Sequence, residues 1–414
     1  MTAGEATTSV PSATRITAWL LALLPVTLLF SGMAATPVLI LVAILAVAAQ
    51  PEPWTARWSR LHAEARFALI MAVLLFAWPL LSPLWSITPL VSLEAATRAI
   101  ALMVFGAVAY VFCRDQHSHA ASLAPRLTAA LLIAGALLVA EKLLPLSPIR
   151  LAYDALGLDY AGFMNKSVNR GLAALAVLTW PAVAALQARG QTVFASMLPL
   201  LMAVPIFLMD SLSAKVALAA AIVVYHVLAH ARWTVTALAV ALPAFVAFWP
   251  AIFQTLDQPV FARAEVYDAL PDTAQHRIEI WRFTLERAAE RPWLGWGAEA
   301  ARAVPGGNVI YAGERKYMPL HPHNGAMQIL LEQGIVGLML SCAALALLLD
   351  RWRALAVSRA AQAAGGAAII AYLAVGFSAF GYWASWWMAL GWLSVILWRG
   401  AVISPASSPS ATRP

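Results

Sequence analysis

Charged residues are scarce in this sequence. Asp, Glu, Lys and Arg together make up 11% of the 414 residues, whereas hydrophobic residues make up 62%. A soluble domain carries about 25% charged and about 45–50% apolar residues. The composition therefore excludes an ordinary water-soluble protein and predicts an integral membrane protein.

Several kinds of site are also missing. Only two cysteines occur, Cys113 and Cys342, and both fall in or beside apolar runs, so neither a disulfide framework nor a cysteine metal site is predicted. The sequence has no Asp-x-Asp pair, His-Glu-x-x-His motif or P-loop, and no cofactor is expected. Lys and Arg outnumber Asp and Glu by 27 to 20, but they form no basic patch interleaved with aromatic residues, so nucleic acid is not an expected partner.

Long apolar runs are what the chain has instead. Runs of the length that crosses a ~30 Å hydrocarbon core predict about twelve transmembrane helices. These runs lie near residues 16–33, 36–50, 66–83, 92–112, 127–144, 169–188, 192–209, 213–231, 233–253, 325–349, 365–381 and 383–400. The predicted fold is an all-α polytopic membrane protein with one large, partly helical loop.

The distribution of Lys and Arg predicts the orientation of the chain. With the N-terminus in the cytoplasm, most arginines outside the apolar runs fall in cytoplasmic connections, as the positive-inside rule requires. The predicted organisation is helices one to nine over 1–253, an extracytoplasmic loop over 254–324, helices ten to twelve over 325–400 and a cytoplasmic tail over 401–414. The long loop is expected to carry function.

Six basic residues break this pattern because they fall on the extracytoplasmic side: Arg98, Lys142, Arg150, Lys166, Arg170 and Lys215. Cations, hydroxyls and helix N-termini at the membrane surface are what a phosphate-bearing lipid head group needs. The alternative is that they are interfacial residues paired with nearby carboxylates.

A short polar motif stands where the long loop meets the tenth apolar run. His321, Pro322, His323 and Asn324 precede an apolar helix that begins at Gly325. Imidazoles titrate near neutral pH, so membrane-embedded chemistry can occur here. We interpret Asn324 as the cap of that helix, with orientation of His323 as the alternative. His321 is either a substrate contact or an ordinary loop residue.

Two more features of this region leave alternatives open. Two imidazoles separated by one proline also fit a metal site, but no Cys or carboxylate stands close by to complete a ligand shell, so no metal is predicted. Glu332 is a carboxylate within an apolar run, and it is either functional or a tie to a neighbouring helix.

The long loop contains a predicted helix. Thr273 is its expected cap, and the helix continues through Glu290 to a stop at Pro292. Helical spacing places Arg277 and Trp281 on the packed face. Arg277 therefore either stacks on Trp281 or faces an anion site.

In this order the motifs resemble those of the O-antigen ligase family. His323-Asn324, nine residues, Gly334, two residues and Gly337 is similar to the signature at the end of the large periplasmic loop of bacterial O-antigen ligases. The segment that runs from Arg277 to a glycine turn at 292–297 resembles the preceding part of that loop. The likeness covers about 270–340, together with the helix count and the position of the loop.

The resemblance also has gaps. Family members often have an Arg at the start of a central helix, where this chain has Lys215. They also have an acidic residue after the eleventh helix, and this chain has no convincing candidate there.

The resemblance implies a metal-independent glycosyltransferase of the bacterial inner membrane with its active site facing the periplasm. Members transfer a glycan from undecaprenyl pyrophosphate to a hydroxyl of the lipid A-core during lipopolysaccharide assembly. Direct displacement would invert the anomeric carbon, and a route through a covalent intermediate is the alternative. His323 is then expected to be the base, kept neutral by the helix N-terminus, and Arg277 to neutralise the leaving pyrophosphate. The other expected substrate contacts are Arg170, Lys215, His321, Asn324, Trp281 and Lys166.

Other functions fit the same sequence. The same superfamily contains O-antigen polymerases and protein O-oligosaccharyltransferases, which use similar donors and different acceptors. A secondary transporter fits the helix count, but transporters have internal repeats and polar residues near the bilayer midplane, and neither feature is found in this chain.

Overall fold

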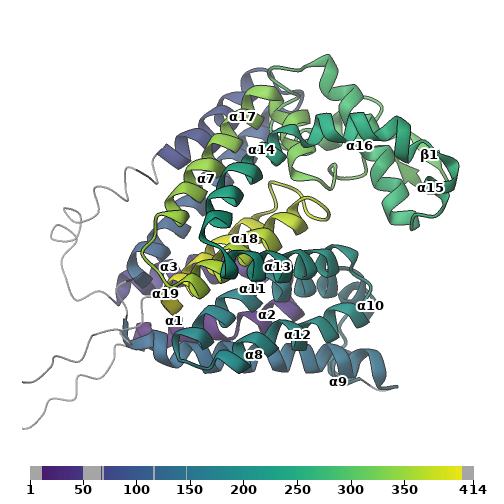
Figure 1. The fold of residues 1–414 in the computed structure, drawn as a ribbon. Helices are drawn as coiled ribbons and strands as arrows, with labels where there is room; N and C mark the ends of the chain where they lie inside the picture. The colour runs from purple at the N-terminus through teal and green to yellow at the C-terminus, as the bar shows by residue number, and fades with distance from the viewer. Residues whose placement is uncertain (1–11, 50–66, 68–69, 115–116, 146, 403–414) are drawn as a thin grey trace, which may run out of the picture. The chain divides into compact units, whose positions relative to one another are not determined.

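The computed structural model describes residues 12–49, 67, 70–114, 117–145 and 147–402 (Figure 1). The chain divides into two compact units, one formed by Met1–Arg60, Val104–Lys215 and Ala389–Pro414, and the other by Leu61–Met103 and Val216–Met388. Three of the four boundaries between the units fall inside helices, namely α7 (Pro89–Arg114), α13 (Leu212–His230) and α19 (Ser385–Val402), and the fourth lies outside the described residues.

The described part of the first unit is helical. Besides its parts of those three helices it contains α1 (Ser12–Ala22), α2 (Leu24–Phe30), η1 (Gly32–Ala34), α3 (Ala35–Ala48), α8 (His117–Leu143), α9 (Pro148–Ala155), α10 (Tyr160–Gly162), η4 (Phe163–Ser167), α11 (Val168–Ala188) and α12 (Thr192–Leu208).

The second unit adds a small hairpin to its helices. Its remaining elements are η2 (Val73–Ala77), α6 (Trp78–Leu81), η3 (Ser82–Leu84), α14 (Arg232–Leu256), η5 (Asp257–Phe261), α15 (Ala264–Asp268), α16 (Asp272–Glu290), η6 (Ala301–Ala303), β1 (Ile310–Ala312), β2 (Arg315–Lys316), α17 (Gly325–Arg353) and α18 (Arg359–Gly376).

Six helices in the described residues are long and apolar enough to cross a membrane, and the count is seven if α1 and α2, which meet at 60°, form one span. The six are Pro89–Cys113, Leu123–Leu143, Val168–Ala188, Leu212–His230, Arg232–Phe261 and Gly325–Arg353. Shorter apolar helices cover Gly32–Ala48, Ile70–Leu84 and Thr192–Leu208. The predicted all-α polytopic class is confirmed, whereas the count of twelve stays a prediction, as do the loop and tail boundaries.

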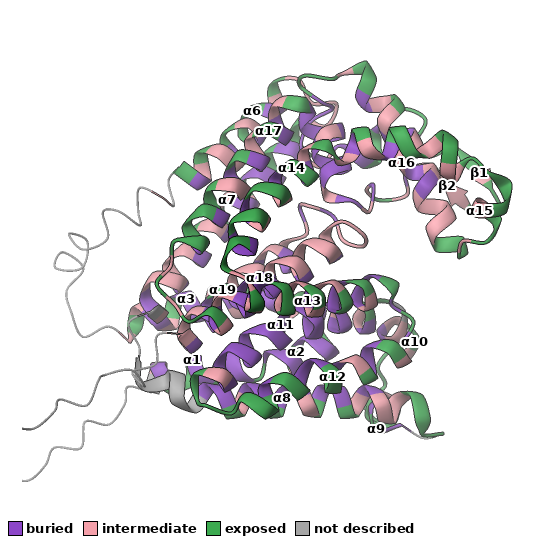
Figure 2. Cartoon of the chain, viewed as in Figure 1, coloured by how far each residue is buried: buried purple, intermediate pink, exposed green. Residues whose placement is uncertain are grey.

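Helix α11 is the core of the first unit. It is buried along almost its whole length, as Figure 2 shows, and it contacts α2, α8 and α12. Small residues permit this close packing: a Cβ at Gly171 would lie 3.0 Å from the Leu29 Cα. A helix that is apolar on every side is stable only in such surroundings or in lipid.

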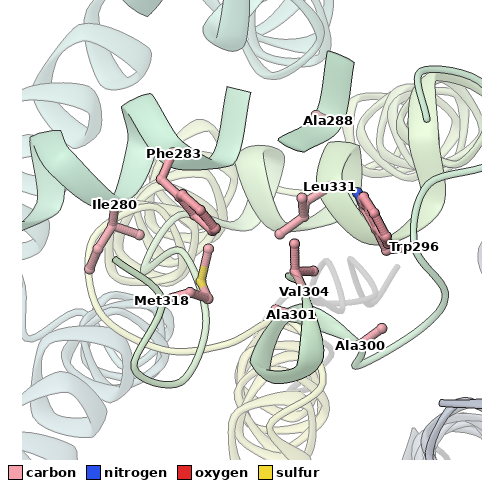
Figure 3. Close-up of a cluster of buried hydrophobic side chains, with 9 residues drawn as sticks. All are labelled: Ile280, Phe283, Ala288, Trp296, Ala300, Ala301, Val304, Met318 and Leu331. Atoms are coloured by element: carbon pink, nitrogen blue, oxygen red, sulfur yellow. The ribbon is translucent and has the colours of Figure 1, made fainter. Parts of the chain in front are cut away.

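In the second unit, α14 packs along α17, with Val246 against Ala326, Ile329 and Leu338. The segment between α14 and α17 folds into a small structure of its own, with helices and a hairpin. Figure 3 shows how Ile280 and Phe283 of α16 point towards a buried cluster that also contains Met318, Val304 and Leu331. Because Leu331 belongs to α17, this cluster fixes α16 to that helix.

The predicted loop helix is confirmed, but its predicted cap is wrong. Helix α16 begins at Asp272, one residue before Thr273, and its first carbonyl comes from Pro271, which accepts hydrogen bonds from the backbone N–H groups of Ala274 and Gln275 at 2.7 and 3.1 Å. No side chain caps this end. Proline suits a helix start because its fixed φ is already close to the helical value.

The hairpin of β1 and β2 follows η6. Its strands are antiparallel and turn at Gly313, whose φ of 56° is one that glycine adopts without strain. His276 of α16 donates its Nε2 proton to the Lys316 carbonyl at 2.9 Å, so the hairpin is tied to α16.

Candidate active site

Helix α17 is broken near its start. Gly334 has φ 65° and ψ −170°, so a segment from Gly325 to Gln333 ends there and a second segment continues to Arg353. A broken helix leaves backbone groups without helical partners, which is costly in an apolar environment. The site is built around this break.

The turn at 292–297 and Trp78 replace the missing helical hydrogen bonds. The replacement bonds are Trp296 N–H to Leu331 O at 3.0 Å, Gly297 N–H to Glu332 O at 2.8 Å, Trp78 Nε1–H to Gln333 O at 3.0 Å and Ile335 N–H to Pro292 O at 2.7 Å. The close approach requires glycine on both sides. A Cβ at Gly334 would lie 2.2 Å from Trp293 O, and one at Gly295 would lie 2.4 Å from Glu332 C.

Asn324 caps α17, as predicted. Its Oδ1 accepts the Met327 backbone N–H at 3.1 Å, and its Nδ2 donates to the Phe377 carbonyl at 3.2 Å. The side chain is buried, and it joins the start of α17 to the end of α18. Asn324 therefore both caps the helix and fixes the position of its neighbour His323.

The backbone and ring of His323 are both constrained. Its φ is 54°, in the left-handed region that non-glycine residues rarely adopt. Its Nδ1 lies 2.7 Å from the carbonyl oxygen of Ala379, in the loop after α18. A carbonyl only accepts, so Nδ1 carries the proton and Nε2 of the neutral ring has the free lone pair. The ring of His323 is thus held by a backbone carbonyl.

His321 lies beside His323, with 4.3 Å between the ring centroids. Its Nδ1 accepts the backbone N–H of His323 at 3.1 Å. Burial lowers the pKa of His321 to about 3, with further lowering by the positive charges of His323 and Arg302. His321 is therefore neutral at pH 7, and it supports the unusual backbone of His323.

The pKa of His323 is also lowered from its ordinary value. Burial is the main cause, and the charges of Arg277 and His276 lower it further, while the hydrogen bond to Ala379 raises it. The neutral form predicted from the sequence is favoured, but burial and neighbouring cations are the causes given by the structure. The contribution of the helix N-terminus stays a prediction.

Arg277 has no acidic partner among the described residues. The guanidinium is half-buried on α16, and burial lowers its pKa. It does not stack on Trp281 either, because Trp281 meets Trp249 and Phe253 edge to face and donates its Nε1 proton to Pro322 O at 2.8 Å. Within the described residues, Arg277 is thus a partly desolvated cation near His323 that no protein anion neutralises.

The other three predicted cations lie in the first unit. Lys166 is exposed in η4, Arg170 packs over Gly32 from the first turn of α11, and Lys215 is half-buried in α13. His323, His321, Asn324, Trp281 and Arg277 all lie in the second unit. The predicted contacts of Lys166, Arg170 and Lys215 with substrate stay predictions.

Two features of the site were not predicted. Ala379 acts through its backbone carbonyl, which leaves no signal in a sequence. Arg302 is an exposed residue of η6 whose charge reaches His321. In the sequence, only the charge of Arg302 could have marked it as a site residue, and many other residues of the loop are charged too.

Comparison with known proteins matches the segment of the chain that contains this site. Residues 174–342, which include the break in α17 and both histidines, match a family described as O-antigen ligase. That family consists of ligases of glycosyltransferase type, and six described helices of this chain are long and apolar enough to cross a membrane. The resemblance predicted from the sequence is confirmed over this segment of the chain.

Three Rickettsia proteins, each named "Putative polysaccharide ligase", are similar to this chain. The Rickettsia prowazekii protein is 28% identical over 237 residues, which is 56% of this chain and 58% of that protein. The Rickettsia conorii protein is 28% identical over 236 residues, 56% of this chain and 57% of that protein. The Rickettsia felis protein is 28% identical over 244 residues, 57% of this chain and 59% of that protein. The chain thus spans less than two thirds of the length of these relatives.

Proposed function

We propose that this protein transfers a glycan from undecaprenyl pyrophosphate to a hydroxyl group of the lipid A-core, at the periplasmic face of the bacterial inner membrane. One observation carries the proposal. The ring of His323 is held by its Nδ1 proton on Ala379 O, so the Nε2 lone pair is available beside Arg277, a cation without a described acidic partner. The O-antigen ligase match supports the class of reaction.

The first part of the reaction is activation of the acceptor. Nε2 of His323 takes the proton from the acceptor hydroxyl as the oxygen forms a bond to the anomeric carbon of the donor glycan. The lowered pKa of His323 keeps the imidazole in the neutral form that can accept this proton at pH 7. The hydrogen bond to Ala379 then helps to stabilise the imidazolium, since an N–H of a cation is a stronger donor.

The second part is departure of the pyrophosphate. The bond between the anomeric carbon and the pyrophosphate oxygen breaks, and undecaprenyl pyrophosphate leaves with the electron pair. Arg277 neutralises the charge that develops there, because its planar fork of donors matches phosphate oxygens. Direct displacement inverts the anomeric configuration. The proton on His323 returns to solvent before the next cycle.

A reconstituted assay tests this function. Purified protein in liposomes is given an undecaprenyl-pyrophosphate-linked glycan and lipid A-core, and the products are separated on a gel. We expect one glycan to be joined to each acceptor, with release of undecaprenyl pyrophosphate and no product when lipid A-core is omitted. Donor-linked chains that lengthen without lipid A-core would instead identify a polymerase.

The orientation of the loop is tested separately. We replace Cys113 and Cys342 with Ala and introduce Glu314→Cys in the exposed turn of the hairpin, or Gln191→Cys between α11 and α12 as the control. A membrane-impermeant thiol reagent should label position 314 in outer-membrane-permeabilised cells and position 191 only after the inner membrane is opened. The reverse pattern would place the site in the cytoplasm.

A further inference from the structure

The carboxylate of Glu332 is the centre of a buried hydrogen-bond network. Glu332 lies two residues before the break in α17, and only 1% of its surface is exposed. Four N–H donors converge on its two oxygens. They are Gln328 Nε2 at 3.2 Å and Ala301 N at 3.3 Å on Oε1, and Glu299 N at 3.1 Å and Trp383 Nε1 on Oε2.

This network fixes the loop that holds His323. Gln328, one helical turn before Glu332, accepts the Tyr382 backbone N–H at 2.7 Å, and Trp383 donates directly to Glu332. Ala379, whose carbonyl holds His323 Nδ1, lies three residues before Tyr382 in the same loop. The position of that carbonyl therefore depends on side chains that are one and two turns inside α17.

The network also fixes a second loop. Glu299 has φ 53°, and its backbone N–H is held by Glu332 while its carboxylate pairs with Arg98 at 2.6 Å. Glu299 and His323 are the two non-glycine residues with positive φ in the described chain. Such backbone strain persists only where the surroundings enforce it, and it clusters at functional sites. The surroundings of Glu299 contact Glu332 directly, and those of His323 do so through the loop of Ala379.

We propose that Glu332 and Gln328 are positioning residues of the transfer reaction. They hold the loop of Ala379, so that His323 keeps its proton on Nδ1 and its lone pair on Nε2. This inference rests on the function proposed above. Both side chains are buried within the first segment of α17, and we assign them no contact with the reacting atoms: they act through the loops that they hold.

The chemistry of the network requires a carboxylate. An ionised carboxylate only accepts, so it satisfies all four donors, whereas the amide of Gln accepts on one atom and donates on the other. Glu332→Gln must therefore turn an NH2 group towards two N–H donors, whichever way the amide is oriented. One of the two loops then loses its anchor, and the donors left unpaired are buried.

Glu332→Gln is the first test. We expect the turnover number to fall about 10–100-fold, as is usual when a residue that orients a functional group is changed, with the donor KM unchanged. The rate at which diethyl pyrocarbonate labels His323 without substrate, followed by mass spectrometry, should change several-fold because the ring is no longer held on Ala379 O. Glu286→Gln is the matched control, since Glu286 is exposed and lies outside the network.

Two gentler variants keep the test decisive if Glu332→Gln does not fold. Trp383→Phe removes one donor, and Gln328→Met removes the link to Tyr382 at similar volume. Each should show the same two changes to a smaller extent. Folded variants with the wild-type turnover number and wild-type labelling of His323 would overturn the inference. Because the labelling needs no substrate, it tests the position of His323 even if transfer proves not to depend on His323.

Discussion

Two arginines five residues apart on α16 lie in opposite surroundings. Arg282 bonds Asp257 through Nε at 2.9 Å and Glu279 through Nη1 at 2.6 Å, and it lies over the ring of Tyr267. Arg277 is partly buried as well, but no described carboxylate pairs with it. Arg282 is thus a paired cation, whereas Arg277, near His323, has no described carboxylate as a partner.

The difference in pairing indicates that Arg282 stabilises the fold and that Arg277 serves the reaction. Hydrogen bonds to Asp257 raise the pKa of the Arg282 guanidinium, whereas burial alone lowers that of Arg277. A desolvated cation without a counterion costs folding free energy, and such groups are concentrated where a ligand supplies the missing charge. We therefore expect changes near Asp257 to affect unfolding and changes near His323 to affect transfer.

Removal of the base should have the largest effect. His323→Ala should reduce glycan transfer by about 10²–10⁴-fold, the usual contribution of a general base, while donor binding is retained. His230→Ala is the control, because His230 is exposed and its ring also bonds only a backbone carbonyl. Transfer and donor affinity are measured on purified protein. Near-wild-type transfer by His323→Ala would remove His323 from the reaction.

The two arginines provide the next test. Arg277→Ala should lower donor turnover by about 10–100-fold without loss of stability, and Arg277→Lys should restore little, since an ammonium cannot reproduce a planar fork on pyrophosphate. Arg282→Ala should instead lower the free energy of unfolding by about 1–3 kcal/mol and leave the turnover of the folded protein near normal. The comparison fails if both variants lose only stability.

A change at the break in α17 should affect the stability of the fold. Gly334→Ala puts a Cβ 2.2 Å from Trp293 O at a φ of 65°, so we expect a loss of about 1–3 kcal/mol in thermal unfolding measured in detergent. Gly400→Ala is the control, because a Cβ there meets nothing within 4 Å. Equal stability of the two variants would show that the break tolerates a side chain.

The elements that the sequence predicted correctly have strong local signals. Asn324 precedes a long apolar run and caps it. The packed face of α16 was predicted only in part, because Arg277 and Trp281 are half-buried whereas Ile280 and Phe283 are buried. The break at Gly334 was not predicted, because a single glycine in an apolar helix has no distinct pattern. The break is stabilised by hydrogen bonds to the backbone of Trp296 and Pro292, which lie about 40 residues away in the sequence.

The chemistry of the site shows the same limit. The sequence identified His323 and Arg277 as candidates, but it offered stacking on Trp281 as an alternative that the structure does not show. The orienting group is the carbonyl of Ala379, and every residue has such a carbonyl. Glu332 was noticed as a carboxylate in an apolar run, yet its four donors come from three separate segments, so their convergence depends on tertiary structure.

The pH dependence of transfer tests the central claim most directly. If neutral His323 is the base, the rate falls as pH drops through its pKa, and because burial and Arg277 lower that pKa, the fall should begin below the ordinary value of about 6.5. The turnover number of wild type and of His323→Gln is measured with saturating donor from about pH 4 to 8. We predict an acidic limb in the wild type and a low, flat profile in His323→Gln. The same limb in both proteins, or none in the wild type, would contradict the assignment of His323 as the base.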